Sequence, residues 1–213
     1  MRLHFFTMSN FTSVQVDLAT VSEEIQEFQD LLDTASSLQE RTDLLPFFRA
    51  HRQLTAWLGT VNTNLVRPDA IAYEHPIFGR YQADILVGDT RQGRFTLIEL
   101  EDAGTDSIFK KKSRTSSYWS SRFFTGFSQL VDWLCEIRTR ATDLALQEEF
   151  GTMQPLLLPA LIVGRDQFLS NRERHRFDWF RQNVLVDSAS PSISTYDELA
   201  LDLDDRIQIA RSL

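Results

Sequence analysis

The sequence predicts an α/β fold in which a central mixed sheet is flanked by helices and preceded by an N-terminal helical segment. Two short runs, 81–88 and 94–101, have strand character and are joined by turn residues, which is typical of an antiparallel hairpin. The near-continuous apolar run 156–163 is typical of a strand buried on both faces. Segments with helical spacing precede and follow these strands, and this alternation favours helices packed on a sheet.

Composition excludes several classes of protein. The chain has 213 residues, a net charge of −8 and a single cysteine, Cys135, so a disulfide-stapled secreted fold is excluded. The N-terminus becomes polar too soon for a signal peptide, and no stretch approaches the roughly 18 apolar residues of a membrane span. We therefore expect a cytoplasmic protein without membrane contact. The sequence has no glycine-rich phosphate loop, so no nucleotide cofactor is expected.

The N-terminal part is predicted to be helical. Ser22, followed by two glutamates, resembles an N-cap and predicts a helix over 22–34. A second helix is predicted over 38–45. Pro46 suits the first turn of a third helix, which Gly59 is predicted to end as a C-terminal glycine.

The remaining elements follow from the same signals. We expect residues 1–60 to form a helical segment packed on a domain over 61–213, the two together making one continuous domain. Thr195 and Glu198 have the spacing of a capping box at the start of the last helix. The other predicted segments are an irregular polar stretch at 102–118, a helix over 118–146, a helix from Ser170 to about Gln182, a strand over 183–187 and a loop over 188–194.

The predicted hairpin carries three acidic residues. Asp84 lies within an apolar strand, and Glu99 and Glu101 lie in the next one. Side chains alternate along a strand, so Glu99 and Glu101 point the same way, about 7 Å apart, and the turn brings Asp84 beside Glu99. Mutual repulsion between these carboxylates would be relieved by Mg²⁺ or Mn²⁺, and such a cation activates water and stabilises charge on a phosphate. The pattern indicates phosphodiester hydrolysis. The alternative is a strand pair with one solvent-facing polar side.

Several segments of the chain resemble a known family. Asp84 followed after fourteen residues by Glu99-Leu100-Glu101 resembles the active-site hairpin of the PD-(D/E)XK nuclease superfamily. The wider context, from about Gln39 to Leu199, resembles the C-terminal domain of the Shedu antiviral defence family. The segments that carry this resemblance, in chain order, are Ala83–Asp89, Leu97–Ala103, Ile108–Lys110, Gly126–Trp133, Ile162–Arg165 and Thr195–Leu199.

This resemblance implies a fold, an activity and a set of site residues. It implies a restriction-endonuclease-like (PD-(D/E)XK) sheet, metal-dependent DNA cleavage in defence against phage, and assembly into a homo-oligomer. Asp84 and Glu99 would be the Mg²⁺ ligands, helped by the carbonyl of Leu100. Gln129 would contact the attacking water or a metal ligand. Glu40, on the second predicted helix, could lend a further ligand.

The sequence departs from the superfamily pattern at Glu101, which occupies the position of the motif lysine. A glutamate cannot supply positive charge, but it could bind a second metal or hold a lysine from elsewhere. The nearest lysines are Lys110, Lys111 and Lys112, and we hypothesise that one of them, Lys112 in the first instance, fills the role. The rival interpretation is a catalytically inactive scaffold of the same fold that binds DNA or protein partners.

The same lysines belong to the best local phosphate-binding cluster of the chain. A loop position would let this cluster reach the DNA backbone. The alternative is a solvated charged loop. The predicted DNA-binding residues are Lys110, Lys111, Lys112, Arg114 and Arg122.

Overall fold

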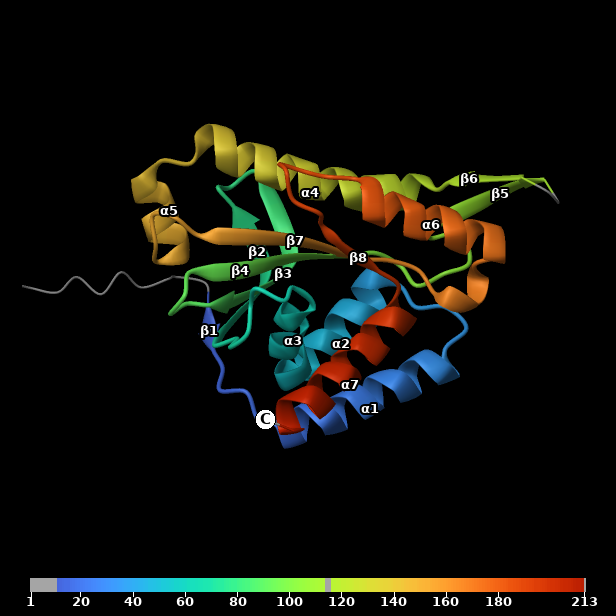
Figure 1. Ribbon diagram of the computed structural model, residues 1–213, viewed down its shortest axis with the longest axis horizontal. Coiled ribbons are helices and arrows are strands. Elements are labelled where there is room, and N and C mark those ends of the chain that lie inside the picture. Colours follow the sequence, from blue (N-terminus) through green and yellow to red (C-terminus); the bar gives the residue numbers. More distant parts are fainter. Residues whose placement is uncertain (1–10, 114–115, 213) are drawn as a thin grey trace, which may run out of the picture.

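The computed structural model describes residues 11–113 and 116–212 and confirms the α/β class (Figure 1). A six-stranded sheet has the order β1-β2-β3-β4-β7-β8, and a two-stranded ribbon has the order β5-β6. Neighbours from β1 to β4 are antiparallel, whereas β7 lies parallel to β4 and β8 parallel to β7, so the main sheet is mixed. The strands are β1 (Thr12–Ser13), β2 (Ala70–Ile77), β3 (Tyr81–Asp89), β4 (Arg94–Leu100), β5 (Phe109–Ser113), β6 (Ser116–Trp119), β7 (Leu156–Ile162) and β8 (Ser192–Ser194).

Two helical layers cover the two faces of the main sheet. Figure 1 shows α1, α2, α3 and α7 on one face, and α4, α5 and α6 on the other. No helix within the described residues combines the length and apolar character needed to cross a membrane. The α-helices are α1 (Leu18–Thr34), α2 (Leu45–Ala50), α3 (Arg52–Leu58), α4 (Ser121–Arg140), α5 (Asp143–Phe150), α6 (Asn171–Asn183) and α7 (Tyr196–Ser212).

The strand alternation divides the core into two clusters. On β3, Ile85 and Val87 pack into the cluster that includes α1, α3 and α7. Leu86 and, on β4, Phe95 and Leu97 pack into the cluster that includes α4 and α6. Both faces of the central strands are therefore buried, as near-continuous apolar strands require.

The N-terminal helices begin at other residues than predicted. Asp17, not Ser22, caps α1, because its carboxylate accepts from the N–H groups of Ala19 and Thr20. The predicted helix over 38–45 is a π-helical turn, Glu40–Leu44, which leads directly into α2, and Pro46 lies in the first turn of α2 as expected.

The prediction that Gly59 ends the third helix is confirmed, because Gly59 is the C-cap of α3. Gly59 has a right-handed helical φ of −56° and is followed by a short 3₁₀ turn, Gly59–Val61. A Cβ at this position would lie 2.5 Å from Cγ1 of Val87. A side chain is therefore excluded by the close approach of α3 to the sheet.

The stretch after the hairpin was predicted to be irregular and then one long helix; residues 102–108 are irregular and helices follow, but the ribbon β5–β6 and the division into α4 and α5 were not predicted. Tyr118 belongs to strand β6, and α4 starts after Ser120, whose hydroxyl accepts from the N–H of Phe123. The helical run to residue 146 is interrupted after α4, and Thr142 caps the separate helix α5.

The strand predicted over 156–163 is confirmed as β7, the strand predicted over 183–187 is wrong, and both predicted helix caps are confirmed. Residues 183–187 contain only an isolated bridge from Val186 to Ala189, and β8 falls in the predicted loop. Ser170 forms a capping box with Glu173 at α6. Thr195 and Glu198 exchange the same pair of hydrogen bonds at α7, 3.1 and 3.2 Å long.

A buried arginine connects the end of β7 to both N- and C-terminal helices. Arg165 is almost fully buried, and its Nη1 donates to the carbonyl of Leu32 in α1 at 2.8 Å. Its Nε lies 2.8 Å from Oδ1 of Asp197 in α7. This contact holds α1 and α7 at the edge of the sheet where β7 ends.

We predict that Arg165→Met lowers the free energy of unfolding by about 3 kcal/mol, because it removes the cation beside the carboxylate of Asp197 and the arginine donor to the buried carbonyl of Leu32. Urea unfolding monitored by circular dichroism measures this change. The control is Arg206→Ala, which removes a partly exposed i,i+4 pair with Asp202 and should cost about 1 kcal/mol or less. Equal effects of the two substitutions would contradict the structural role of Arg165.

Candidate functional site

The hairpin of β3 and β4 places two acidic side chains next to each other. Ile85 pairs with Ile98, and Leu86 with Leu97. Continuing this antiparallel register by one residue sets Asp84 opposite Glu99. Since side chains alternate along each strand, both carboxylates lie on the same face as Leu86 and Leu97, which is the face covered by α4.

The carboxylate of Glu99 is buried between the sheet and α4. The residue is only 4% exposed, and Nε2 of Gln129 on α4 donates a hydrogen bond to its Oε1. The pKa of Glu99 is raised to about 10. Burial is the largest cause, and the negative charges of Asp84, Glu101 and Glu40 add to it. Gln129 therefore contacts one of the two predicted metal ligands directly.

Asp84 is partly buried and is held by the backbone of the neighbouring strand. Its Oδ2 accepts from the N–H of Leu100 at 2.8 Å. Burial raises the pKa of Asp84 to about 7, although this hydrogen bond lowers it. Leu100 thus orients a carboxylate through its N–H, while its side chain packs in the core on the opposite face of the sheet.

Glu101, which follows the end of β4, is engaged by an arginine. The residue is buried, and its Oε2 accepts from Nη1 of Arg122 at 3.1 Å. Nη2 of the same arginine lies 3.0 Å from Oδ2 of Asp102. Burial raises the pKa of Glu101 to about 7, against the lowering effect of Arg122. The carboxylate at the motif-lysine position is thus paired with a cation from α4.

A cleft of about 680 Å³ joins these groups. Glu40, at the start of the π-helical turn, lies on its wall, and its backbone N–H donates to Asp102 at 2.8 Å. The described side chains that line the cleft include arginines but no lysine. The lining residues are Glu40, Arg41, Pro76, Gly79, Arg80, Tyr81, Gln82, Asp84, Glu99, Glu101, Arg122, Thr125 and Gln129.

The predicted lysines lie elsewhere on the molecule. Lys110 and Lys111 are exposed on β5, and Lys111 lines a different, small hollow beside Glu173. Lys112 belongs to β5, but its side chain is outside those that the structure describes, as is Arg114 as a whole.

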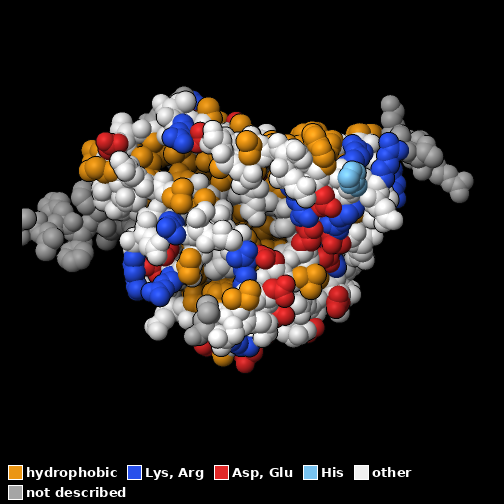
Figure 2. Space-filling view, in the orientation of Figure 1, with side chains coloured by type: hydrophobic (Ala, Val, Ile, Leu, Met, Phe, Trp, Pro, Cys, Tyr) orange, Lys and Arg blue, Asp and Glu red, His pale blue; other side chains and the backbone are white. Residues whose placement is uncertain are grey.

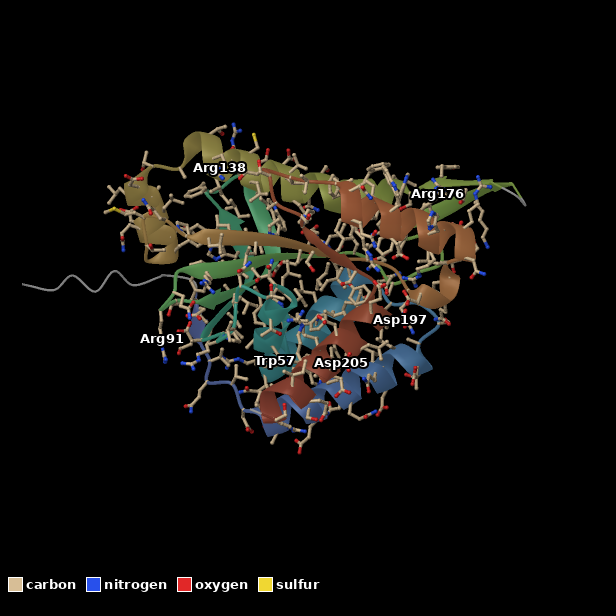
Figure 3. All side chains as sticks on the ribbon, viewed as in Figure 1. Trp57, Arg91, Arg138, Arg176, Asp197 and Asp205 are labelled. Carbon is tan, nitrogen blue, oxygen red and sulfur yellow. The ribbon has the colours of Figure 1, made fainter. Side chains whose placement is uncertain are left out.

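A basic surface surrounds this ribbon. Arg176 of α6 lies over the rings of Phe109 and Trp119, 4.7 and 5.6 Å from their centroids, and so fixes the ribbon against α6. Figure 2 shows Lys and Arg side chains gathered at this end of the molecule, with acidic side chains beside them, and Figure 3 labels Arg176 there.

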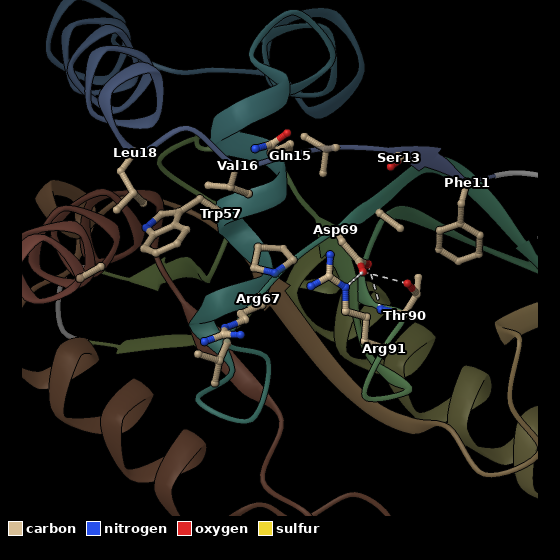
Figure 4. Close-up of a pocket in the computed structure, with 15 residues that line it drawn as sticks. Phe11, Ser13, Gln15, Val16, Leu18, Trp57, Arg67, Asp69, Thr90 and Arg91 are labelled. Carbon is tan, nitrogen blue, oxygen red and sulfur yellow. Dashed lines mark hydrogen bonds and ion pairs between the residues drawn. The ribbon is translucent and has the colours of Figure 1, made fainter. Parts of the chain in front are cut away.

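A larger hollow, of about 1010 Å³, lies near the opposite edge of the sheet (Figure 4). Trp57 and Leu18 form part of its wall. Its polar groups include Arg67 and the cluster in which Asp69 accepts from Thr90 and lies 3.7 Å from Arg91. Among its described lining residues Asp69 is the only acid, whereas the smaller cleft holds the three acids that the sequence singled out.

The donor set of the cleft suits a hard cation. Within residues 11–113 and 116–212, no group of three or more His, Cys, Asp or Glu side chains is arranged to hold a metal ion. Mg²⁺, however, is usually held by one or two carboxylates and keeps several waters. Asp84 and Glu99 supply two carboxylates, and the crowding of acidic groups around Glu99 is relieved by positive charge. The residues therefore fit such an ion.

Comparison with known proteins places the chain in a family. A family model described as Shedu protein SduA, C-terminal, matches residues 20–200. The chain belongs to this family. Membership in the Shedu family implies a role in defence against phage. A search of curated proteins finds no match. The matched range covers the entire carboxylate cleft, from Glu40 to Gln129.

No role at the cleft was predicted for Gly126, although a signal for one was present in the sequence. Gly126 lies inside α4, where an isolated glycine usually has a packing reason. A Cβ at this position would lie 2.8 Å from Leu161 and 2.9 Å from Cγ of Glu101. Gly126 therefore lets α4 approach the sheet closely enough for Gln129 and Arg122 to reach the acids.

We predict that Gly126→Ala destabilises the protein by about 1–3 kcal/mol, because overpacking against the sheet outweighs the roughly 1 kcal/mol that alanine gains in a helix. Thermal unfolding measures the change. Ser128→Ala, at an exposed position of the same helix, should shift stability by about 0.5 kcal/mol or less. A stabilised Gly126→Ala protein would contradict the close contact of α4 with the sheet.

The raised pKa values predict an unusual dependence of stability on pH. A carboxyl group whose pKa is higher in the folded than in the unfolded state stabilises the fold below its unfolded pKa, and this contribution is lost as pH rises toward the folded pKa. For Glu99 that range runs from 4.5 to about 10, and for Asp84 from 3.8 to about 7. In EDTA at pH 8, Glu99→Gln should therefore raise the Tm by about 3–6 °C, with the difference shrinking toward pH 4.5.

The control for this measurement is Glu23→Gln at an exposed position of α1, which should leave the Tm unchanged at both pH values. A native protein that is at least as stable as Glu99→Gln at pH 8 without metal would mean that burial of this carboxylate is compensated in another way.

Proposed function

We propose that this Shedu family member is a metal-dependent DNA endonuclease of the restriction-endonuclease-like (PD-(D/E)XK) type. The observation that carries the proposal is the placement of Asp84 and Glu99 side by side on adjacent strands, with Glu99 buried among acids in an open cleft. An uncompensated carboxylate in such a position is costly, and a bound cation offsets the cost.

Each residue of the cleft has a distinct task in this proposal. Asp84 and Glu99 hold Mg²⁺ or Mn²⁺, and the Leu100 N–H and Gln129 side chain fix the orientation of these two carboxylates. When bound, the ion supplies Lewis acidity and a water of lowered pKa. In the hydrolysis, the water oxygen bonds to phosphorus and loses a proton, while the P–O ester bond breaks and the leaving oxygen gains one.

Substrate binding is assigned to the basic ribbon. Lys110 and Lys111 project from β5 at exposed positions, and Lys112 and Arg114 continue the same basic run. Such groups contact phosphates without reading sequence. We further propose that the protein acts in the cytoplasm as a homo-oligomer, for which the exposed Phe124 and Val131 on α4 offer an apolar surface.

The direct test is cleavage of plasmid and linear DNA with Mg²⁺ or Mn²⁺. We predict that the native protein cleaves, that EDTA abolishes cleavage, and that Asp84→Asn and Glu99→Gln each reduce the rate at least about 100-fold, because each removes one anionic ligand. The control is Asp132→Asn, at an exposed position of α4, which should retain the native rate.

Cleavage that persists in both variants would place the active site elsewhere. A folded native protein that cleaves neither substrate with either metal would favour the alternative function, a non-catalytic scaffold that binds DNA or protein partners. The specific observation in favour of that alternative is Glu101, which stands where the superfamily has lysine.

A further inference from the structure

The cleft as described has an imbalance of charge for its proposed substrate. Glu40, Asp84, Glu99 and Glu101 contribute four acidic side chains to its lining. A phosphodiester is itself an anion, and negative charge grows on its non-bridging oxygens as the attacking water adds. A cation on the protein is needed at this point, and Glu101 cannot provide it.

Arg122 is positioned to provide that charge. Its guanidinium bridges Glu101 and Asp102 through Nη1 and Nη2, at 3.1 and 3.0 Å. These contacts occupy two of the five N–H donors of an arginine. The side chain remains 43% exposed and lines the same cleft as Asp84 and Glu99. The guanidinium is therefore anchored on one edge and has donors left for a ligand in the cleft.

The other cations of the cleft are less well placed. Arg41 is 85% exposed and lies 3.6 Å from Glu40, and Arg80 is 54% exposed and lies 3.8 Å from Glu136. Both are more exposed than Arg122, and the contact that each makes with an acid is longer than those of Arg122. Arg122 instead has two short contacts with residues that follow β4 directly, so its position is tied to that of Glu99.

We propose that Arg122 is a catalytic residue that donates hydrogen bonds to the non-bridging oxygens of the scissile phosphate, and that Glu101 is the positioning residue that holds it there. The positive charge missing from the strand is thus supplied from α4 across the cleft. This inference rests on the proposed nuclease function. It assigns the role of the hypothesised lysine to Arg122, and it gives Glu101 a task other than binding a second metal.

The test compares single-turnover cleavage of saturating DNA by the native protein, Arg122→Ala, Arg122→Lys and Arg138→Ala. Arg138 is the matched control, since it lies near the other end of α4 (Figure 3), is exposed and pairs with Asp187 at 2.6 Å. We expect Arg122→Ala to lower the rate constant at least about 100-fold, Arg122→Lys to retain more activity than Arg122→Ala, and Arg138→Ala to match the native protein.

Two further measurements separate a catalytic role from a structural one. Affinity for Mn²⁺, measured by calorimetry, and affinity for DNA in Ca²⁺ should each change by about threefold or less in Arg122→Ala. Added guanidinium ion should partly restore its cleavage rate. If Arg122→Ala does not fold, Arg122→Lys and Arg122→Gln are compared in its place, with lysine expected to be the faster of the two.

The outcomes distinguish the two proposals. Cleavage by Arg122→Ala within threefold of the native rate, or loss of cleavage that follows entirely from lost Mn²⁺ affinity, would overturn the role of Arg122 while leaving the nuclease function standing. Equal rates for the lysine and glutamine variants would overturn it as well. Absence of cleavage by the native protein would overturn the nuclease function, and the role of Arg122 with it.

Discussion

The burial of the Glu99 carboxylate between β4 and α4 is the constraint on which the arrangement of the site depends. A charged group in this position is costly, and the acids nearest to it increase the cost. The hydrogen bond from Gln129 offsets only part of the cost of burying this charge. The remaining negative charge faces a cleft that is open to solvent, where a cation would stabilise it. This uncompensated negative charge is the physical reason for proposing a cation site here and not a purely structural core.

The position of α4 determines which side chains reach the acidic groups. Gly126 lets the helix lie against Leu161 and Glu101, and one turn on either side of it the helix presents Arg122 and Gln129 to the acids. The end of β4 is held from the opposite face as well, because the hydroxyl of Tyr196 donates to the carbonyl of Glu101 at 2.8 Å. The face that carries the acidic side chains is therefore coupled to the helical layer of α1 and α7 through the backbone of one strand.

The part of the site that lies on one hairpin could be predicted from sequence, since a short turn and strand alternation suffice to bring Asp84 beside Glu99. Strand β2 could not be predicted from the sequence. Pro76 lacks a backbone donor and so argues against a strand, and Glu74 adopts a φ of +48°, an irregularity that the sequence pattern does not show. The ribbon β5–β6 was not predicted, because it is rich in lysine and serine, whose strand propensity is low. Its stability comes from stacking with Arg176, a tertiary contact.

The pairing of Glu101 with Arg122 could not be predicted from the sequence either, because it is also a tertiary contact. The predicted helix begins at residue 118, whereas α4 begins after Ser120, and helical spacing alone does not determine which strand residue a side chain of the helix contacts. The prediction assigned the missing positive charge to lysines that follow Glu101 in the chain. The cation that reaches Glu101 comes instead from the first turn of the next helix, and its direction is determined by the packing of α4 at Gly126.

The central claim, that Asp84 and Glu99 form a cation site, is tested most directly by titrating the metal-free protein with Mn²⁺ at pH 7.5 and following free Mn²⁺ by electron paramagnetic resonance. The account predicts saturable binding at the native site and loss of that binding in both Asp84→Asn and Glu99→Gln. Binding of equal strength in the native protein and in both variants would contradict it, because the ion would then be held by other residues.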